Sequence, residues 1–335
     1  MTSGDALPRV GLVLTGGTID SLGVDRLDTA WYIEANKRLG DGELMARIPE
    51  VAQLAHVEEF TFRRLPSHAL VGADLLELAT FLSDVFGQGV DAIVITHGTN
   101  TLEETAFFLN LVLKTARPVV LTGAMRPASA VSADGDLNLL NAIRLAASPS
   151  AAGLGVLVAM NGTVISARDV TKTNTYSVGA FQAPDAGVLG VTDADGRIVI
   201  RHRSTRPHTT ESEFDLSHVE ALPRVDVVVS YIGADGAMID AAVAAGAKGI
   251  VSAGTGAGRP TPAEDAAFVR AGEQGVVICQ ASRVGSGRVV RGPALRRKRF
   301  VASGDLQPWK ARILLALALT VTSDPDRIQA FFDRY

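Results

Sequence analysis

Two segments of the sequence place hydroxyl side chains directly after apolar runs, with glycines between them. The run Val10–Leu14 leads into TGGT (15–18), and the run Ala92–Ile95 leads into THGTN (96–100). A glycine has no Cβ, so the backbone N–H groups around it can turn toward a ligand. The two loops could therefore offer the hydroxyls of Thr18 and Thr99, with several amide donors, to one small substrate. Glycine and threonine after a strand also form ordinary turns, so a purely structural role is the alternative.

Both loops lack a base. A threonine hydroxyl is a poor nucleophile unless a base takes its proton and donors stabilise the oxyanion. Neither loop contains a carboxylate. The segment SARDVTKTNTYS (166–177) offers Lys172 among hydroxyl and amide side chains, and a desolvated lysine can be neutral and act as a base. A lysine in a solvated loop is the alternative interpretation.

The elements that position these residues follow from the hydrophobic pattern. Apolar runs alternate with helical patterns, which favours βα units and a mostly parallel sheet. Residues just past the carboxyl ends of parallel strands line the ligand crevice, so the two threonine loops should be neighbours. Thr101 to Glu104 fits a capping box that starts the next helix. We expect strands at 10–14, 92–96, 119–122, 155–160, 225–231, 249–252 and 276–279, and helices at 73–86, 102–115, 134–147, 236–245, 262–273, 308–321 and 325–333.

The chain is long enough for more than one core. It has 335 residues, which favours one large domain or two unequal ones. The pattern breaks in a polar stretch that contains His202, His208 and His218, none with the spacing of metal ligands. We predict an N-terminal α/β domain over 1–200, a linker over 201–223 and a smaller C-terminal α/β domain over 224–335. No metal site is expected.

Composition and charge restrict the possible partners. Hydrophobic residues make up 47% and charged residues 20%, with a net charge of −4, so nothing indicates binding to nucleic acid or to a membrane surface. No signal peptide and no apolar run long enough for a bilayer are recognised, which predicts a cytoplasmic protein. The single cysteine, Cys279, lies in an apolar run and is expected to be a small buried hydrophobe.

Two further segments have unusual composition. GTGAGRP (254–260) is rich in glycine, but it lacks the spacing of a phosphate-binding loop. Residues 274–304 contain seven basic residues and no acid. Such a run is usually a solvated face, and the alternative is that it presents positive charge to a substrate or partner.

Longer stretches resemble the bacterial L-asparaginase/glutaminase family over nearly the whole chain. They are TGGTID (15–20), ITHGTNTLEETAFFLN (95–110), RPVVLTGAMRPASAVSADGDLNLLNA (117–142), ARDVTKTNT (167–175), GIVSAGTGAG (249–258) and FVASGDLQPWKARILLALALT (300–320). The resemblance implies a two-domain α/β fold without a cofactor. It also implies a homotetramer of intimate dimers, in which the C-terminal domain contributes to the partner subunit's active site.

The resemblance also implies roles for individual residues. Thr18 matches the nucleophile, and Thr99 and Lys172 match the second threonine and its lysine. Tyr32 is the nearest match to the tyrosine of the mobile loop that covers the nucleophile. The substrate-binding positions are Ser67, which would hold the α-carboxylate, Ala124, whose carbonyl would receive the leaving amide, and Gly98 in the second threonine loop.

Four positions depart from the family pattern. Asn100 stands where the family has the aspartate that pairs with the substrate α-ammonium, and His68 replaces a glutamine beside Ser67. Arg259 replaces an asparagine that is contributed across the dimer. The acid-free segment 283–300 replaces a segment bearing a glutamate that also reaches the substrate α-ammonium across the dimer. The resemblance thus predicts an amidohydrolase that acts on a small carboxylate-bearing amide through a threonine acyl-enzyme. Its substrate would be L-asparagine or a related amide without a free α-ammonium. The alternatives are an N-substituted (opine- or Amadori-like) asparagine hydrolase and a catalytically inactive small-molecule binding protein.

Overall fold

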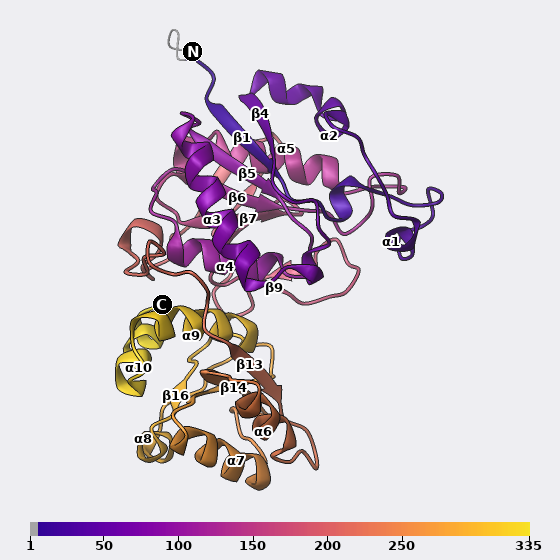
Figure 1. Cartoon of the computed structure of the whole chain (residues 1–335). Coiled ribbons are helices and arrows are strands. Elements are labelled where there is room, and N and C mark those ends of the chain that lie inside the picture. Colours follow the sequence, from indigo (N-terminus) through magenta and orange to yellow (C-terminus); the bar gives the residue numbers. More distant parts are fainter. Residues whose placement is uncertain (1–5) are drawn as a thin grey trace. The chain divides into compact units, whose positions relative to one another are not determined.

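The computed structural model describes residues 6–335 and contains two compact units (Figure 1). The first unit ends at Ser212 and the second begins at Glu213. This division falls inside the stretch 201–223. Each unit is an α/β structure with its own sheet and its own hydrophobic core.

Unit 1 is built on an eight-stranded sheet with the strand order β12-β11-β8-β7-β6-β5-β1-β4. The strands from β4 to β7 are parallel to one another, and β8, β11 and β12 extend the sheet in antiparallel pairs. The mostly parallel architecture predicted from the sequence is therefore confirmed. The strands are β1 (Arg9–Leu14), β4 (His56–Thr61), β5 (Ala92–Thr96), β6 (Val119–Thr122), β7 (Val156–Met160), β8 (Thr163–Ser166), β11 (Gly190–Thr192) and β12 (Ile198–Ile200).

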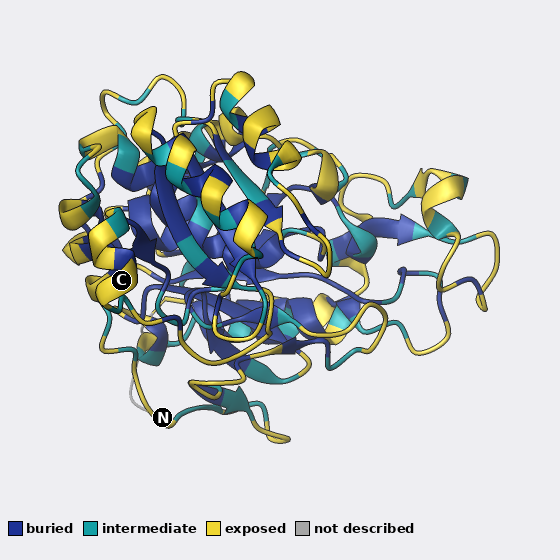
Figure 2. Cartoon of the chain, turned by 90° about the horizontal axis from the view of Figure 1, so that it is seen from below, coloured by how far each residue is buried: buried dark blue, intermediate teal, exposed yellow. Residues whose placement is uncertain are grey.

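Helices cover both faces of this sheet, with α3 and α4 on one face and α5 on the other (Figure 1). The central strands β5, β6 and β7 are buried along their whole length, as their continuous apolar runs predict. Figure 2 shows interior strands in dark blue and the outward faces of helices in yellow. The helices are α1 (Tyr32–Ala35), α2 (Glu43–Ala46), α3 (Gly72–Gly87), α4 (Leu102–Val112) and α5 (Gly135–Ala146), with 3-10 turns η1 (Thr18–Asp20), η2 (Pro49–Gln53), η3 (Ser67–Ala69), η4 (Pro149–Ala151) and η5 (Thr209–Glu211).

Two small hairpins in unit 1 carry residues of the site. One pairs β2 (Ser21–Leu22) with β3 (Lys37–Arg38) and encloses α1. The other pairs β9 (Thr171–Lys172) with β10 (Phe181–Gln182). Neither hairpin belongs to the main sheet, and each contributes side chains to the cavity described below.

Unit 2 has a parallel sheet of four strands in the order β13-β14-β15-β16. One face packs on α6, α7 and α8, and the other packs on α9. Cys279 is fully buried in β15, where burial raises the pKa of its thiol, so the predicted small hydrophobe is confirmed. The elements are β13 (Val225–Val229), α6 (Ala237–Ala244), β14 (Gly249–Gly254), α7 (Pro262–Glu273), β15 (Val277–Ser282), α8 (Pro293–Lys298), β16 (Val301–Ala302), α9 (Pro308–Val321) and α10 (Pro325–Arg334). Across the described residues, every helix is too short or too polar to span a bilayer.

The predicted capping box at Thr101 is wrong. The Thr101 side chain makes no hydrogen bond to the first turn of α4, because its hydroxyl donates to the backbone carbonyl of Ser67 at 2.8 Å. A tertiary contact thus replaces the local one. A reciprocal capping box forms instead at α7, where Thr261 Oγ1 accepts from the backbone N–H of Glu264 and Glu264 Oε2 accepts from that of Thr261.

Candidate active site

Three loops of unit 1 meet at Gly98. Strands β1 and β5 are parallel neighbours, with Leu14 opposite Thr96, so the loops that follow them leave the same edge of the sheet. A Cβ built on Gly17 would lie 2.7 Å from the Cα of Gly98, and a Cβ built on Gly98 would lie 2.6 Å from the Oγ of Ser67. Gly17 also has φ +115°, which a residue with a side chain rarely adopts. Glycine at both positions therefore lets the loops pack against each other.

The loops surround a cavity of about 630 Å³. The sequence-predicted site residues that line it are Thr18, Tyr32, Ser67, His68, Gly98, Thr99, Asn100 and Lys172. They come from η1, α1, η3 and β9 and from the loop between β5 and α4. Thr18 and Lys172, which are 154 positions apart in the sequence, thus line the same cavity.

Thr18 forms a pair with Tyr32. Thr18 begins the 3-10 turn after β1, and its Oγ1 lies 2.8 Å from the phenol oxygen of Tyr32 at the start of α1. Burial raises the pKa of Tyr32, with an opposing effect of the hydrogen bond to Thr18, so Tyr32 is a neutral phenol at neutral pH. Figure 1 shows the segment around α1 standing out from the side of unit 1. The nucleophile candidate is thus in contact with a projecting segment of the chain.

Thr99 forms a second pair with Lys172. The Nζ of Lys172 donates to Thr99 Oγ1 at 2.9 Å. Burial lowers the pKa of Lys172, and the nearby charge of Glu103 opposes this shift. Lys172 is fixed by the pairing of β9 with β10, opposite Phe181. The arrangement supplies an amine with reduced proton affinity in contact with a hydroxyl.

Ser67 carries an orphaned hydroxyl. Its side chain is buried, and its Oγ has no hydrogen-bond partner within the described residues. A buried polar atom without a partner costs free energy, so this hydroxyl is available to a ligand in the cavity. The neighbouring His68 and Asn100 are exposed on the cavity wall.

Ala124 differs from the other predicted residues. It is fully buried and is absent from the cavity lining, whereas the next residue, Met125, lines the cavity. The loop is held by the carboxylate of Asp134, which accepts hydrogen bonds from the backbone N–H groups of Met125 and Arg126 at 3.0 and 2.9 Å. The burial of its side chain does not conflict with the predicted role of Ala124, because that role involves only its backbone carbonyl.

Arg259 belongs to unit 2. It closes a tight turn in which Thr255 and Arg259 exchange two backbone hydrogen bonds of 2.8 Å. Its side chain is exposed.

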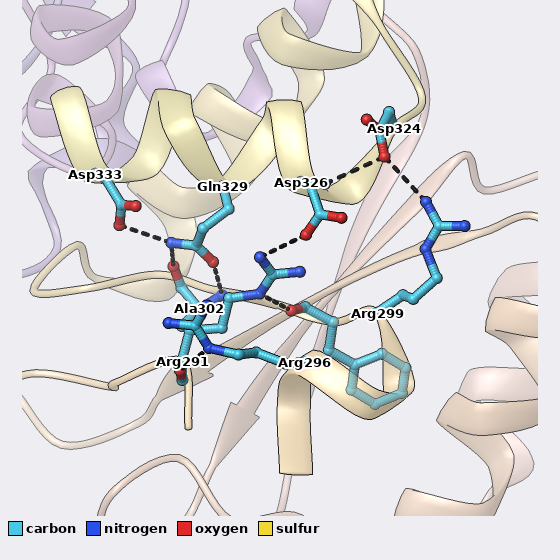
Figure 3. A network of polar contacts seen from close by, with 9 residues as sticks. Arg291, Arg296, Arg299, Ala302, Asp324, Asp326, Gln329 and Asp333 are labelled. Carbon is cyan, nitrogen blue, oxygen red and sulfur yellow. Dashed lines mark hydrogen bonds and ion pairs between the residues drawn. The ribbon is translucent and has the colours of Figure 1, made fainter. Parts of the chain in front are cut away.

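The basic segment of unit 2 is partly neutralised by its surroundings. Arg291 pairs with Asp326 at 2.7 Å, and Arg299 pairs with Asp324 at 3.0 Å, both acids lying at the start of α10 (Figure 3). Lys298 pairs with Asp265 of α7 at 2.6 Å. The acids missing from the segment itself are thus supplied by two helices that pack beside it. Three of the seven basic residues of 274–304 are therefore engaged in ion pairs within unit 2.

Other residues of the site were not predicted. His97 is fully buried, and burial lowers its pKa to about 4 despite its hydrogen bond to the Gly98 carbonyl, so it is neutral at physiological pH. Glu103 lies behind Lys172, and Lys37 and Arg38 line the cavity. No sequence signal separates Glu103 from its neighbour Glu104, since each lies four residues before a phenylalanine.

The cavity lining is rich in positive groups. It includes Lys37, Arg38 and Lys172, and no aspartate or glutamate of the described residues is part of it. Arg38 is paired with Asp20 at 3.2 Å, outside the lining, and burial raises the pKa of that acid. Within residues 6–335, no group of three or more His, Cys, Asp or Glu side chains is placed to hold a metal ion.

Comparisons with known proteins point to the same family in both parts of the chain. The family described as "Asparaginase, N-terminal" matches residues 9–206, and the "Glutaminase/Asparaginase C-terminal domain" matches residues 224–332. L-asparaginase 2 of Bacillus subtilis is 41% identical, covering 98% of this chain and 87% of its own. The glutaminase-asparaginase of Pseudomonas fluorescens is 39% identical, covering 98% and 91%. The crystal structure of a probable cytoplasmic L-asparaginase from Campylobacter jejuni has a TM-score of 0.94 and 38% identity, covering 98% of this chain and 100% of its own.

Proposed function

The chain belongs to the asparaginase/glutaminase family, and on this basis we propose that it hydrolyses a small carboxylate-bearing amide through an acyl-enzyme on Thr18. The observation that carries the proposal is the single cavity that contains the Thr18–Tyr32 pair, the Thr99–Lys172 pair and the orphaned hydroxyl of Ser67. Nucleophile, proton acceptor and carboxylate anchor are the groups that this reaction requires.

The proposed reaction has two steps. The Oγ1 of Thr18 attacks the amide carbonyl and its proton passes to a neighbouring base. The C–N bond of the tetrahedral intermediate then breaks as this proton is returned to the nitrogen, which leaves as ammonia. Water then hydrolyses the ester on Thr18 and releases the acid. Lys172, with its lowered pKa and its contact with Thr99, is the candidate proton acceptor. Backbone N–H groups of the glycine loops are candidates to stabilise the oxyanion.

The charge of the cavity wall favours substrates that carry a carboxylate and no free α-ammonium. A carboxylate is favoured by the charge of Lys37 and by the orphaned hydroxyl of Ser67, whereas an α-ammonium finds no carboxylate among the described lining residues. An ammonium taken out of water without a paired anion is costly. We therefore propose a preference for amides whose α-amine is missing or substituted, and L-asparagine as the weaker substrate.

The proposal includes a second subunit. The active form is a homotetramer, and the C-terminal domain, with Arg259 and the segment 283–300, contributes to the site of the partner subunit. Support comes from the family membership, because the resemblance in the sequence implies such shared sites. The proposed domain limits are the predicted ones, 1–200 and 224–335.

Ammonia release from a panel of amides tests the proposal. The panel contains L-asparagine, L-glutamine, succinamate and N-substituted asparagines. Release from any of them that depends on Thr18 supports an amidohydrolase, and succinamate or an N-substituted asparagine should have the highest kcat/KM. Binding of these amides without any release of ammonia would instead indicate a catalytically inactive binding protein.

A further inference from the structure

The Glu103 side chain is a buried acid directly behind the proposed reaction centre. It lies in the first turn of α4 and is only 7% exposed. Its Oε1 accepts the backbone N–H of Lys172 at 3.4 Å, and its Oε2 is buried with no hydrogen-bond partner among the described residues. Buried carboxyl oxygens are normally satisfied, because desolvation without a partner costs free energy. This oxygen therefore requires an explanation beyond the packing of α4.

We propose that Glu103 is a positioning residue of the site: it fixes the backbone of Lys172 and supplies the negative charge that the Lys172 amine faces. The inference rests on the proposed role of Lys172 in catalysis. Asn100, the neighbour of Thr99 at the cavity, is an amide and carries no charge. The ammonium of Lys172 contacts a hydroxyl rather than a carboxylate, so the charge behind it sets how easily it loses its proton.

The charges around Lys172 are few. Burial lowers its pKa, and among residues 6–335 the charge of Glu103 opposes this effect. The other titratable side chains that line the same cavity, on α1, β3, η3 and the loop after β9, are Tyr32, Lys37, Arg38, His68 and Tyr176. Removing the charge of Glu103 should therefore lower the pKa of Lys172 further, while removing a distant acid should not change it.

A purely structural role for Glu103 makes a different prediction. The backbone hydrogen bond to Lys172 alone could be kept by an uncharged side chain of the same shape, as in Glu103→Gln. Such a variant would then change stability by a small amount and leave the pKa of Lys172 where it is. The titration of Lys172 thus separates the two roles.

The experiment measures the pH dependence of acetylation of Lys172 by peptide mass spectrometry in the full-length folded protein. In Glu103→Gln the apparent pKa of Lys172 should fall by about one unit or more, the size expected for a nearby opposite charge. The matched control is Glu59→Gln, which removes an exposed acid of β4 and should leave Lys172 unchanged. Because acetylation needs no turnover, the result is independent of the proposed amide hydrolysis.

Two outcomes decide the matter. A folded Glu103→Gln protein with an unchanged or higher Lys172 pKa overturns the proposal. If this variant does not fold, Glu103→Asp replaces it, since it retains the charge but withdraws it by one methylene. The pKa of Lys172 should then fall in the same direction by a smaller amount, and an unchanged value overturns the proposal.

Discussion

Gly17 and Gly98 lie back to back, so close that a Cβ on Gly17 would be 2.7 Å from both the Cα and the backbone nitrogen of Gly98. Each glycine precedes one of the two threonines of the cavity. The distance between the loops after β1 and β5 is therefore set by the absence of side chains at these two positions. Any side chain there must move one threonine relative to the other.

Gly98→Ala tests this contact. Its new Cβ would lie 2.6 Å from the Oγ of Ser67, so Ser67 and the loop must shift. We expect kcat/KM to fall at least about tenfold, or about 1.4 kcal/mol of transition-state stabilisation. The control is Gly87→Ala at the end of α3, where a Cβ meets nothing within 4 Å and the change should stay within about 0.5 kcal/mol. Equal kinetics of the two variants would refute the contact as a constraint on the site.

Asn100→Asp tests the specificity hypothesis. The new carboxylate would stand on the cavity wall, where no aspartate or glutamate of the described residues lies. One charge-assisted hydrogen bond is worth about 1.5–3 kcal/mol, so kcat/KM for L-asparagine relative to succinamate should rise roughly ten- to a hundredfold. Asn174→Asp places the same charge elsewhere on the wall and should change the ratio less. If L-asparagine is already the best substrate and Asn100→Asp does not improve it, the hypothesis is wrong.

The pH dependence follows from the direction of the Lys172 shift. Burial lowers the pKa of Lys172, so it loses its proton at lower pH than a free lysine and the neutral amine is available closer to neutral pH. Activity should therefore persist toward neutral pH, and Lys172→Met should abolish it. A rate that rises only as the pH approaches ~10.4, the value of a free lysine, would contradict the assignment.

Oligomeric state tests the shared-site hypothesis. We expect an even-numbered assembly, with the tetramer as the active form, because closed symmetry is the rule for homo-oligomers. Sedimentation velocity at the enzyme concentration of the assay measures this directly. An active monomer at that concentration would show that one chain suffices.

The main sheet was predictable where strands are buried on both sides. The runs at 92–96 and 119–122 are continuous apolar stretches and form β5 and β6 with the predicted limits. The edge strand β4 was missed, because its sequence HVEEFT exposes most of its residues and has no apolar run. The antiparallel strands β8, β11 and β12 were missed as well, since each has only three or four residues.

Only those site residues that lie beside elements with a clear local pattern could be predicted from the sequence. The two threonine loops follow from local pattern, since each comes directly after a buried strand. Ser67 was found through the family resemblance alone, because the strand that delivers it, β4, gave no signal. Glu103 and Glu104 are adjacent acids, and the sequence does not say which of them is buried. That choice depends on how α4 packs against the rest of unit 1.

The most direct test of the account is the rate of ammonia release by Thr18→Ala and Thr18→Ser, each with the best amide of the panel. The alanine variant removes the nucleophilic oxygen and should lose turnover while it keeps the fold, as judged by its melting temperature. The serine variant keeps the oxygen and should retain measurable activity. A Thr18→Ala rate within about tenfold of the wild type, equivalent to roughly 1.4 kcal/mol of barrier, would contradict the acyl-enzyme on Thr18 and shift the nucleophile to Thr99.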